Sequence, residues 1–307
     1  MILCCGEALI DMVPTRSDAG ESAFVPRAGG AGLNAAIALG RLGVPVSLFA
    51  GISRDQFGES LLETLRASEV NVSRVLMASR PTTLAFAHVV DRKATYSFHD
   101  EYSAGRMLIE ADLPALDSTI STLLFTGISL VCEPCGSTFE TLLRRSHHAH
   151  VTMLDPNIRP AFIGEREAHL VRMRRMIGMA DIVKLSDDDL AWFGEAGELD
   201  AIACRWLKAG PSLLVVTRGE RGAIAYTSRS KVEAPVPNVS VADTIGAGDT
   251  ASAALLAWLH EAGMLTKEAI GSLGGNDLRA ALAFSMRVAG TSVTRAGANP
   301  PWRHELT

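Results

Sequence analysis

Between residues 123 and 217 the sequence alternates short apolar runs with amphipathic stretches, and this alternation restricts the fold more than any other feature. The apolar runs have the length of buried strands and lie at 123–126, 151–155, 182–185 and 213–217. The stretches between them predict helices at 136–147, 165–178, 187–194 and 198–208. Strands that alternate with helices form a parallel sheet covered on both faces. The sequence therefore predicts an α/β fold with three layers, α/β/α, around a mostly parallel sheet.

The flanking segments add further elements and a second sheet. Apolar and amphipathic patterns predict strands at 2–5 and 46–50, and helices at 30–42, 56–67, 250–259 and 278–288. Residues 83–98 resemble a hairpin with its turn at 91–93, whereas 14–20 is rich in turn residues. Together, about 12–26 and 83–99 predict a small sheet outside the main one. All of these elements are assigned to one domain over residues 1–307.

Composition narrows the class of protein. With 48% hydrophobic and 21% charged residues, the chain is typical of a globular enzyme. The net charge of −5 and the lack of a Lys/Arg run argue against a nucleic-acid partner. No apolar stretch approaches the ~18 residues of a membrane span, and the first residues lack a basic leader segment. The 5 cysteines, an odd number, suggest reduced thiols, so a cytoplasmic location is expected.

One pair of cysteines has the spacing of a redox or zinc motif. Cys132 and Cys135 are separated by two residues, Glu133 and Pro134. Because a single pair without further ligands is a weak signal for either chemistry, a structural or incidental pair is the favoured interpretation.

The stretch Asp243-Thr244-Ile245-Gly246-Ala247-Gly248-Asp249 directly precedes small and apolar residues that predict a buried helix. Glycines at such a junction let backbone N–H groups converge, and the helix dipole is positive there, so a phosphate is a suitable ligand. Asp249 lies in the first turn, where its charge would repel a phosphate unless it serves as base for an attacking hydroxyl. The simpler alternative is an acidic residue that stabilises the helix start.

A second glycine-rich segment, Gly29-Gly30-Ala31-Gly32-Leu33-Asn34, begins the helix predicted at 30–42. With Ala35 its spacing also satisfies a dinucleotide-binding fingerprint. That fingerprint belongs directly after the first strand, with an acidic residue after the next strand, and neither condition holds here. Asp11 and Asn34 could instead bind adjacent hydroxyls of a ligand such as a sugar. The alternative for Asn34 is a polar helix residue facing solvent.

Polar residues follow the carboxyl ends of three predicted strands, where ligands bind in parallel α/β sheets. These groups are Asp155-Pro156-Asn157-x-Arg159, Lys184-x-Ser186-x-x-Asp189 and Thr217-Arg218-Gly219-x-x-Gly222. Glycines in the third group would let the backbone pass close to phosphates. A plain β-hairpin turn between Val215 and Ile224 explains the same residues equally well.

Together these stretches resemble the ribokinase-like (PfkB) family of sugar kinases over nearly the whole chain. The 243–249 stretch matches the carboxy-terminal signature Asp-Thr-x-Gly-Ala-Gly-Asp at every defining position. Gly29, Gly30 and Asn34, with the preceding Asp11, match the amino-terminal signature. Residues 6–14 resemble the fructokinases of this family in particular. The resemblance implies the ribokinase-like fold, in which the small sheet forms a lid over the sugar.

The resemblance further implies ATP-dependent phosphorylation of a primary hydroxyl of a small sugar. Asp249 would accept the hydroxyl proton, while the amides of Gly246, Ala247 and Gly248 hold the charge of the transferred group. Sugar contacts are expected from Asp11, Gly30, Asn34, Phe98, Arg159 and Asp249. ATP contacts are expected from Lys184, Ser186, Thr217, Gly219, Gly222, Gly246, Gly248 and Asn276. Asp189 would lie in the outer shell of Mg²⁺, and a monovalent cation such as K⁺ is suggested near 285–295.

Several acceptors stay open. Fructose is favoured over 2-keto-3-deoxygluconate, whose carboxylate needs a cation where this chain has Asp100. Ribokinases carry a Glu near the position of 126–128, and this chain has none there. Another ketose, a nucleoside and a non-catalytic sugar-binding regulator are further alternatives, although a regulator would lack the base or the glycines. An exposed edge of the lid sheet can pair with another edge, so a homodimer is one option, although the sequence does not determine the oligomeric state.

Overall fold

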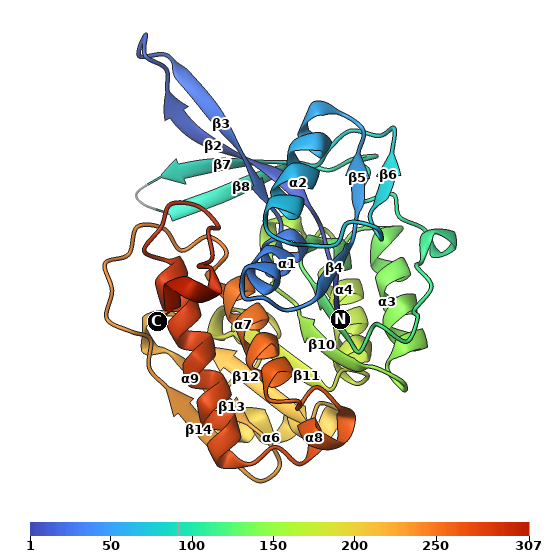
Figure 1. Ribbon diagram of the computed structural model, residues 1–307, viewed down its shortest axis with the longest axis vertical. Coiled ribbons are helices and arrows are strands. Elements are labelled where there is room, and N and C mark those ends of the chain that lie inside the picture. The colour runs from blue at the N-terminus through green and yellow to red at the C-terminus, as the bar shows by residue number, and fades with distance from the viewer. Residues whose placement is uncertain (91–92, 307) are drawn as a thin grey trace.

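The computed structural model describes residues 1–90 and 93–306, and for 88–90 and 93–95 it describes the backbone only. Its largest sheet consists of β1 (Ile2–Cys5), β4 (Val46–Phe49), β9 (Thr122–Thr126), β10 (Val151–Asp155), β11 (Ile182–Ser186), β12 (Leu213–Thr217), β13 (Ala223–Tyr226) and β14 (Lys231–Ala234). The order across the sheet is β14-β13-β12-β11-β10-β9-β1-β4 (Figure 1). Pairing is parallel from β4 to β12 and antiparallel at the β13–β14 edge. The mostly parallel sheet is therefore confirmed.

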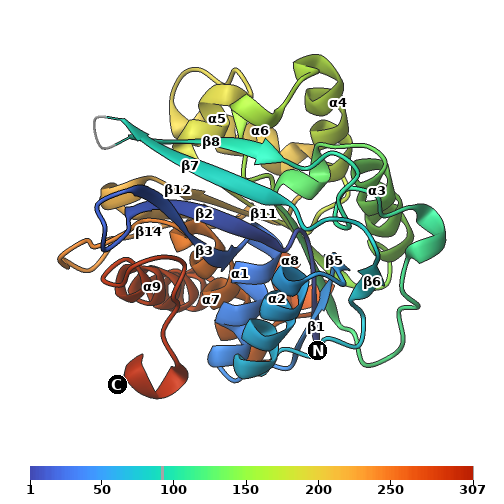
Figure 2. The same ribbon diagram turned by 90° about the horizontal axis from the view of Figure 1, so that it is seen from above.

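Successive side chains of a strand point to opposite faces of the sheet, and in this sheet they are apolar on both faces. Helices therefore cover both faces. On β1, Ile2 and Cys4 belong to one buried core, and Leu3 and Cys5 belong to the other. The first core includes residues of α1 (Ala31–Arg41), α2 (Gln56–Ala67), α7 (Ala247–Glu261), α8 (Lys267–Gly271) and α9 (Gly275–Ser292). The second includes residues of α3 (Cys135–Ser146), α4 (Arg166–Ile177), α5 (Asp187–Trp192) and α6 (Leu199–Ala209). Figure 2 shows α4–α6 on one side of the strands and α1, α2, α7 and α9 on the other, which confirms the three layers.

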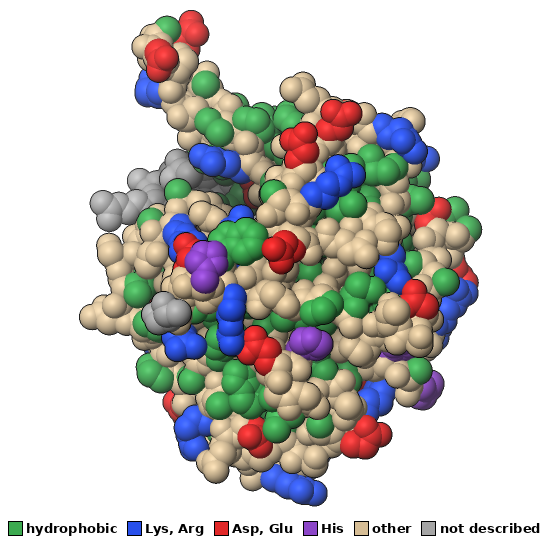
Figure 3. Space-filling model, viewed as in Figure 1, with side chains coloured by type: hydrophobic (Ala, Val, Ile, Leu, Met, Phe, Trp, Pro, Cys, Tyr) green, Lys and Arg blue, Asp and Glu red, His purple; other side chains and the backbone are tan. Residues whose placement is uncertain are grey.

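A second sheet lies above this body and consists of β2 (Leu9–Arg16), β3 (Ser22–Gly29), β7 (Leu84–Val90) and β8 (Lys93–His99), in the order β3-β2-β7-β8. The β2–β3 hairpin projects from the body (Figures 1 and 3). Of the turn-rich stretch predicted at 14–20, residues 18–20 do form a turn, but the prediction is wrong for 14–16, because β2 continues to Arg16. β7 pairs with residues 10–12 of β2, whereas Pro14 pairs with Phe24 of β3 and lies beyond the β7 pairing. One side of β2 is therefore an edge at this point, where a proline is tolerated. Of the turn predicted at 91–93, residues 91 and 92 lie outside the described residues.

The sequence patterns did not reveal the shortest elements. These are β5 (Gly51–Ser53) and β6 (Leu76–Ala78), which pair with each other, the edge strand β14, and α8. Segments of three to five residues are too short to show a period. Single 3₁₀ turns occur at Glu110–Asp112, Ile128–Leu130, Pro160–Phe162, Gly219–Arg221 and Arg303–Leu306. Across the described residues, no helix combines the length and apolar character that crossing a bilayer requires.

The first turn of α1 approaches the end of β1 through two glycines. An alanine Cβ at Gly32 would lie 2.5 Å from the carbonyl carbon of Gly6 and 2.6 Å from its Cα. Because both neighbours are backbone atoms, we expect Gly32→Ala to lower the free energy of unfolding by about 1–3 kcal/mol in urea denaturation. Gly164→Ala, where a Cβ would meet nothing within 4 Å, is the control and should stay within about 0.5 kcal/mol of the parent. Equal stability of the two variants would contradict this close approach.

Candidate active site

The loop before α7 turns sharply into the helix at Gly246. This residue has φ 73°, and a Cβ there would lie 2.7 Å from the Cβ of Ala298, so only glycine fits. No side chain caps the first turn of α7. The N–H of Ala247 donates to the carbonyl of Thr244 at 3.2 Å, so this amide is not free for a ligand as the sequence had suggested. An anion at this turn would therefore depend on Gly248 and the helix dipole more than on Ala247.

Asp249 lies in this first turn and is 6% exposed. The side-chain amide of Asn34 donates to its Oδ2 at 2.9 Å, and that of Asn157 donates to its Oδ1 at 3.0 Å. Burial and the charge of Asp155 raise the pKa of Asp249 to about 6, although the hydrogen bond from Asn34 acts in the opposite direction. Two amides therefore fix the Asp249 carboxylate, which is more basic than that of an ordinary aspartate and is still ionised at neutral pH.

Asp11 faces Asp249 from β2. Burial, followed by the charges of Asp249 and Glu7, raises its pKa to about 6, while the guanidinium of Arg159 lowers it. The Asp11 carboxylate lies over Gly29, where an added Cβ would be 2.1 Å from Oδ2. Gly29 therefore leaves the space that the Asp11 side chain needs. The structure brings Asp11, Asn34, Arg159 and Asp249 together, as the sequence predicted.

The lid sheet supplies an aromatic surface to the same region. Phe98 packs on Phe162 at 4.8 Å between ring centroids and on Tyr96 at 6.1 Å. The pKa of Tyr96 is raised by burial and then by the charge of Asp11, so this phenol lies near the acidic pair. An aromatic wall beside carboxylates and amides suits the apolar face and the hydroxyls of a sugar.

A buried ion pair lies on the other side of Asp249. Lys184 Nζ is 2.9 Å from Asp155 Oδ2, and Ser252 donates to the same oxygen at 2.8 Å. A Cβ at Gly248 would lie 3.0 Å from Lys184 Nζ, so the ammonium group reaches the first turn of α7. This cation therefore lies where the sequence placed a phosphate contact.

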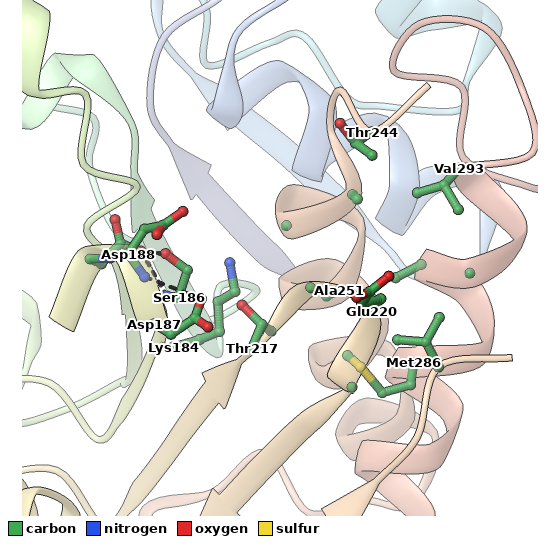
Figure 4. Close-up of a pocket in the computed structure, with 18 of the residues that line it drawn as sticks. Lys184, Ser186, Asp187, Asp188, Thr217, Glu220, Thr244, Ala251, Met286 and Val293 are labelled. Carbon is green, nitrogen blue, oxygen red and sulfur yellow. Dashed lines mark hydrogen bonds between the residues drawn. The ribbon is translucent and has the colours of Figure 1, made fainter. Parts of the chain in front are cut away.

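A cavity of about 1060 Å³ opens next to Lys184, between β11, β12, α7 and α9. In Figure 4, Ser186, Asp187 and Asp188 lie on one side of it, and Met286 and Val293 lie on the other. Apolar side chains form most of the wall away from Lys184, and these are Val236, Pro237, Val239, Val241, Met286, Ala289 and Val293. The cavity is thus polar and charged at the end where Lys184 lies and apolar at the other, a combination that suits a nucleotide.

Two predicted ATP-binding groups line this cavity. Thr217, Gly219 and Gly222 lie at the turn between β12 and β13, so the hairpin interpretation is confirmed, whereas ATP binding by this turn stays a prediction. Ser186 caps α5, and Asp189 completes the cap by accepting hydrogen bonds from the N–H and hydroxyl of Ser186. Asp189 Oδ1 accepts from the N–H of Ile158 at 2.9 Å. Asp189 therefore holds two backbone segments in place, a role that the sequence did not indicate.

Asn276 does not line this cavity, contrary to the prediction from the resemblance. It is exposed in the first turn of α9, whereas the cavity is lined by Met286 and later residues of this helix. At 1.5 Å per residue, the distance along the helix from Asn276 to Met286 is about 15 Å.

Asp100 stands where a carboxylate ligand would need a cation, and its own contacts are internal. It is buried, accepts hydrogen bonds from Thr83 at 2.7 Å and from Ser103 at 2.9 Å, and lies 3.9 Å from Arg106. Its charge is thus held within the base of the lid sheet rather than offered to a ligand.

Sequence reasoning assigned no role to two further residues. Asn157 was noted only as part of a polar strand end, yet it contacts Asp249. Glu7 accepts from the N–H groups of Ala31 at 2.9 Å and Ser129 at 3.2 Å, and its carboxylate lies against Gly127. An acidic residue after the first strand was the available signal for Glu7. Glu7 thus places a carboxylate beside residues 126–128, although it lies far from them in the sequence.

The pair Cys132 and Cys135 is chemically quiet. Both are free thiols, and burial raises the pKa of Cys132 to about 12 and that of Cys135 well above its ordinary value. A thiol that stays protonated is a poor nucleophile and metal ligand, which agrees with a structural interpretation.

Comparison with known proteins identifies the family. Residues 1–305 match the pfkB family carbohydrate kinases. A fructokinase of Rhizobium leguminosarum bv. trifolii is 51% identical over 279 residues, which is 91% of this chain and 86% of that protein. A fructokinase of Salmonella typhimurium is 32% identical over 85% of each protein. The structure titled fructokinase with bound ATP, from Xylella fastidiosa, has a TM-score of 0.90 at 26% identity and covers 99% of this chain and 97% of its own. The chain therefore belongs to the pfkB family of carbohydrate kinases.

Proposed function

We propose that this carbohydrate kinase transfers the γ-phosphoryl group of ATP to a primary hydroxyl of fructose, with Asp249 as the base. One observation carries the proposal: a buried, ionisable carboxylate lies in the first turn of α7, between the acidic sugar side at Asp11 and the cavity next to Lys184. The Rhizobium and Salmonella relatives, both named fructokinase, support the choice of acceptor.

The chemistry follows from this arrangement. The sugar hydroxyl oxygen bonds to the γ-phosphorus while the bond from phosphorus to the bridging oxygen breaks and ADP leaves. The hydroxyl proton moves to Asp249. Charge on the transferred group is stabilised by the start of α7 around Gly248 and by Lys184. The raised pKa of Asp249 makes it a better proton acceptor than an ordinary carboxylate.

The residues around the cavity are compatible with a Mg²⁺ ion that arrives with the nucleotide. Among the described residues, no group of three or more His, Cys, Asp or Glu side chains could form a protein cage for a metal. Mg²⁺ usually keeps several waters and is held by one or two carboxylates together with phosphates. Asp188, exposed at the cavity, and Asp189, in the outer shell, would hold it. When bound, it neutralises phosphate charge. K⁺ near 285–295, a homodimer and a cytoplasmic location stay predictions.

We expect activity to depend on a group that titrates near pH 6. The base must be ionised, and burial raises the pKa of Asp249 to about 6, so kcat should rise as the pH increases through 6 and level off above 7. Burial also raises the pKa of Asp11 to about 6. The acid limb of the plot of kcat/KM against pH should therefore be steeper than the ionisation of a single group would give. A profile of rate against pH from 5 to 9 measures this. A flat profile down to pH 5 would contradict the environment assigned to Asp249.

The position of the new phosphate ester tests the proposed function. Incubation with MgATP and fructose should give one equivalent of ADP and a sugar phosphate whose ³¹P and ¹³C NMR signals show an ester on a primary carbon. An ester on a secondary carbon would contradict the proposed geometry. ADP without a sugar phosphate would indicate ATP hydrolysis and remove fructose as the acceptor.

A further inference from the structure

We infer that Asn157 is a positioning residue for the base, and this inference rests on the proposed role of Asp249. The Asn157 side chain donates to Asp249 Oδ1 at 3.0 Å, while Asn34 donates to Oδ2 at 2.9 Å. Because the two amides come from different elements and hold different oxygens, they fix the plane of the carboxylate. One amide alone would leave the carboxylate able to rotate about its side-chain bond.

The backbone at Asn157 supports a specific role for this side chain. Its φ is +43°, a region that non-glycine residues rarely adopt and that asparagine tolerates better than most. The next N–H, that of Ile158, donates to the buried carboxylate of Asp189. Two residues earlier, Asp155 pairs with Lys184. These contacts on both sides keep the strained backbone in place, so the amide is presented to Asp249 in one orientation.

The same contacts connect the two halves of the site. Asp189 caps α5 beside the cavity and holds the segment after β10 through Ile158. That segment carries Asn157 to Asp249 on α7. The orientation of the base is thereby tied to the turn that lines the nucleotide side. The Asn157 side chain therefore lines the cavity beside Lys184 and also contacts the base.

Asn157 can act on orientation without adding charge. The charged groups near Asp249 are Asp11 on β2, Asp155 on β10, Lys184 on β11, and Arg159 after β10. These groups set the local potential, whereas a neutral amide donor favours the ionised carboxylate through one hydrogen bond. Loss of this donor should therefore affect both the rate and the pH at which the base ionises.

The test uses the full-length enzyme and four variants: Asn157→Gly, Asn157→Ala, Asp249→Asn, and the double variant of Asn157→Gly with Asp249→Asn. Glycine removes the amide and accepts a positive φ, whereas alanine removes the amide and adds backbone strain. We expect kcat to fall about 10- to 100-fold in both Asn157 variants. KM for ATP should stay within about 2-fold. The acid limb of the pH profile should move upward by about half a unit or more. Glu69→Gly, at an exposed residue that also has a positive φ, is the control and should keep full activity.

The double variant distinguishes positioning from an independent contribution. If Asn157 acts through the carboxylate, adding Asn157→Gly to Asp249→Asn should change kcat by less than about 2-fold. Losses that multiply would overturn the inference, and so would an unchanged kcat and pH profile in Asn157→Gly. The proposed function fails separately if Asp249→Asn alone keeps near-normal turnover.

Discussion

Asp249→Asn is expected to lower kcat by about 10²–10⁴-fold, because a positioned base contributes a factor of this size and the amide cannot accept the hydroxyl proton. The substitution keeps the size of the side chain. Asn34 and Asn157 can each rotate their amide to present an oxygen or a nitrogen, so the contacts of the site can be kept. The KM for ATP should therefore change little. Steady-state rates with MgATP and the sugar at pH 8 measure the effect.

The same variant should be at least as stable as the parent above pH 7. The pKa of Asp249 in the folded protein, about 6, lies above its ordinary value of 3.8, so the folded state binds more protons between these values. Stability is thus lost as the pH rises through this range, and asparagine removes that cost, which is on the order of 1–3 kcal/mol. A large drop in kcat together with an unchanged or higher midpoint of thermal unfolding is the expected pair of results. Near-normal turnover, or a loss of rate explained by unfolding, would contradict the role of Asp249.

Breaking the buried ion pair should have the largest effect on stability. Lys184→Met leaves the carboxylate of Asp155, which is 1% exposed, without its cation. Removing one partner of a buried pair costs about 3–5 kcal/mol, because the remaining charge stays desolvated. We expect a decrease of that size in the free energy of unfolding, measured by urea denaturation at pH 7.5. Activity should also fall, since the ammonium group beside Gly248 is lost.

Two comparisons separate this effect from a general sensitivity to lysine replacement. Lys231 pairs with Asp200 at 2.7 Å on the surface, where solvent screens the charges, so Lys231→Met should leave the free energy of unfolding close to that of the parent. Asp155→Asn combined with Lys184→Met removes both charges and should recover part of the stability, though not the activity. If the single and double variants were equally unstable, packing rather than the unpaired charge would be the cause.

Much of the fold could be predicted because its signals are local. The strands from β9 to β12 are apolar runs between helices with a clear amphipathic period, and the order along the chain implies parallel pairing. The edge of the sheet could not be predicted in this way. β14 has only four residues and pairs with β13. The turn that leads from β12 to β13 has a sequence that also suits a phosphate loop. Pro14 was misleading because it suggested a turn. A proline is tolerated in a strand where one side of that strand has no partner, and the sequence does not show where β2 has such a side.

The site was predictable where one residue type has one use. An acidic residue at a helix start is common by itself, and Asp249 stood out because all of 243–249 matches a family signature. Contacts made across distant segments could not be predicted in the same way. Asn157 and Asn34 meet Asp249 from different elements, and Glu7 reaches Gly127 only in the folded chain. Asn276 shows that a position assigned by resemblance can also be wrong, because it lies about three helical turns from the cavity that it was expected to line.

Release of ADP from MgATP, measured by a coupled assay against a panel of acceptors, tests the central claim most directly. The panel is fructose, 2-keto-3-deoxygluconate, ribose, tagatose and adenosine, each over a range of concentration. The account predicts turnover on fructose with a kcat/KM well above that of every other acceptor. Preferred turnover on 2-keto-3-deoxygluconate or adenosine would contradict the proposed acceptor, and no turnover on any sugar while ATP still binds would contradict the role of Asp249 as a catalytic base.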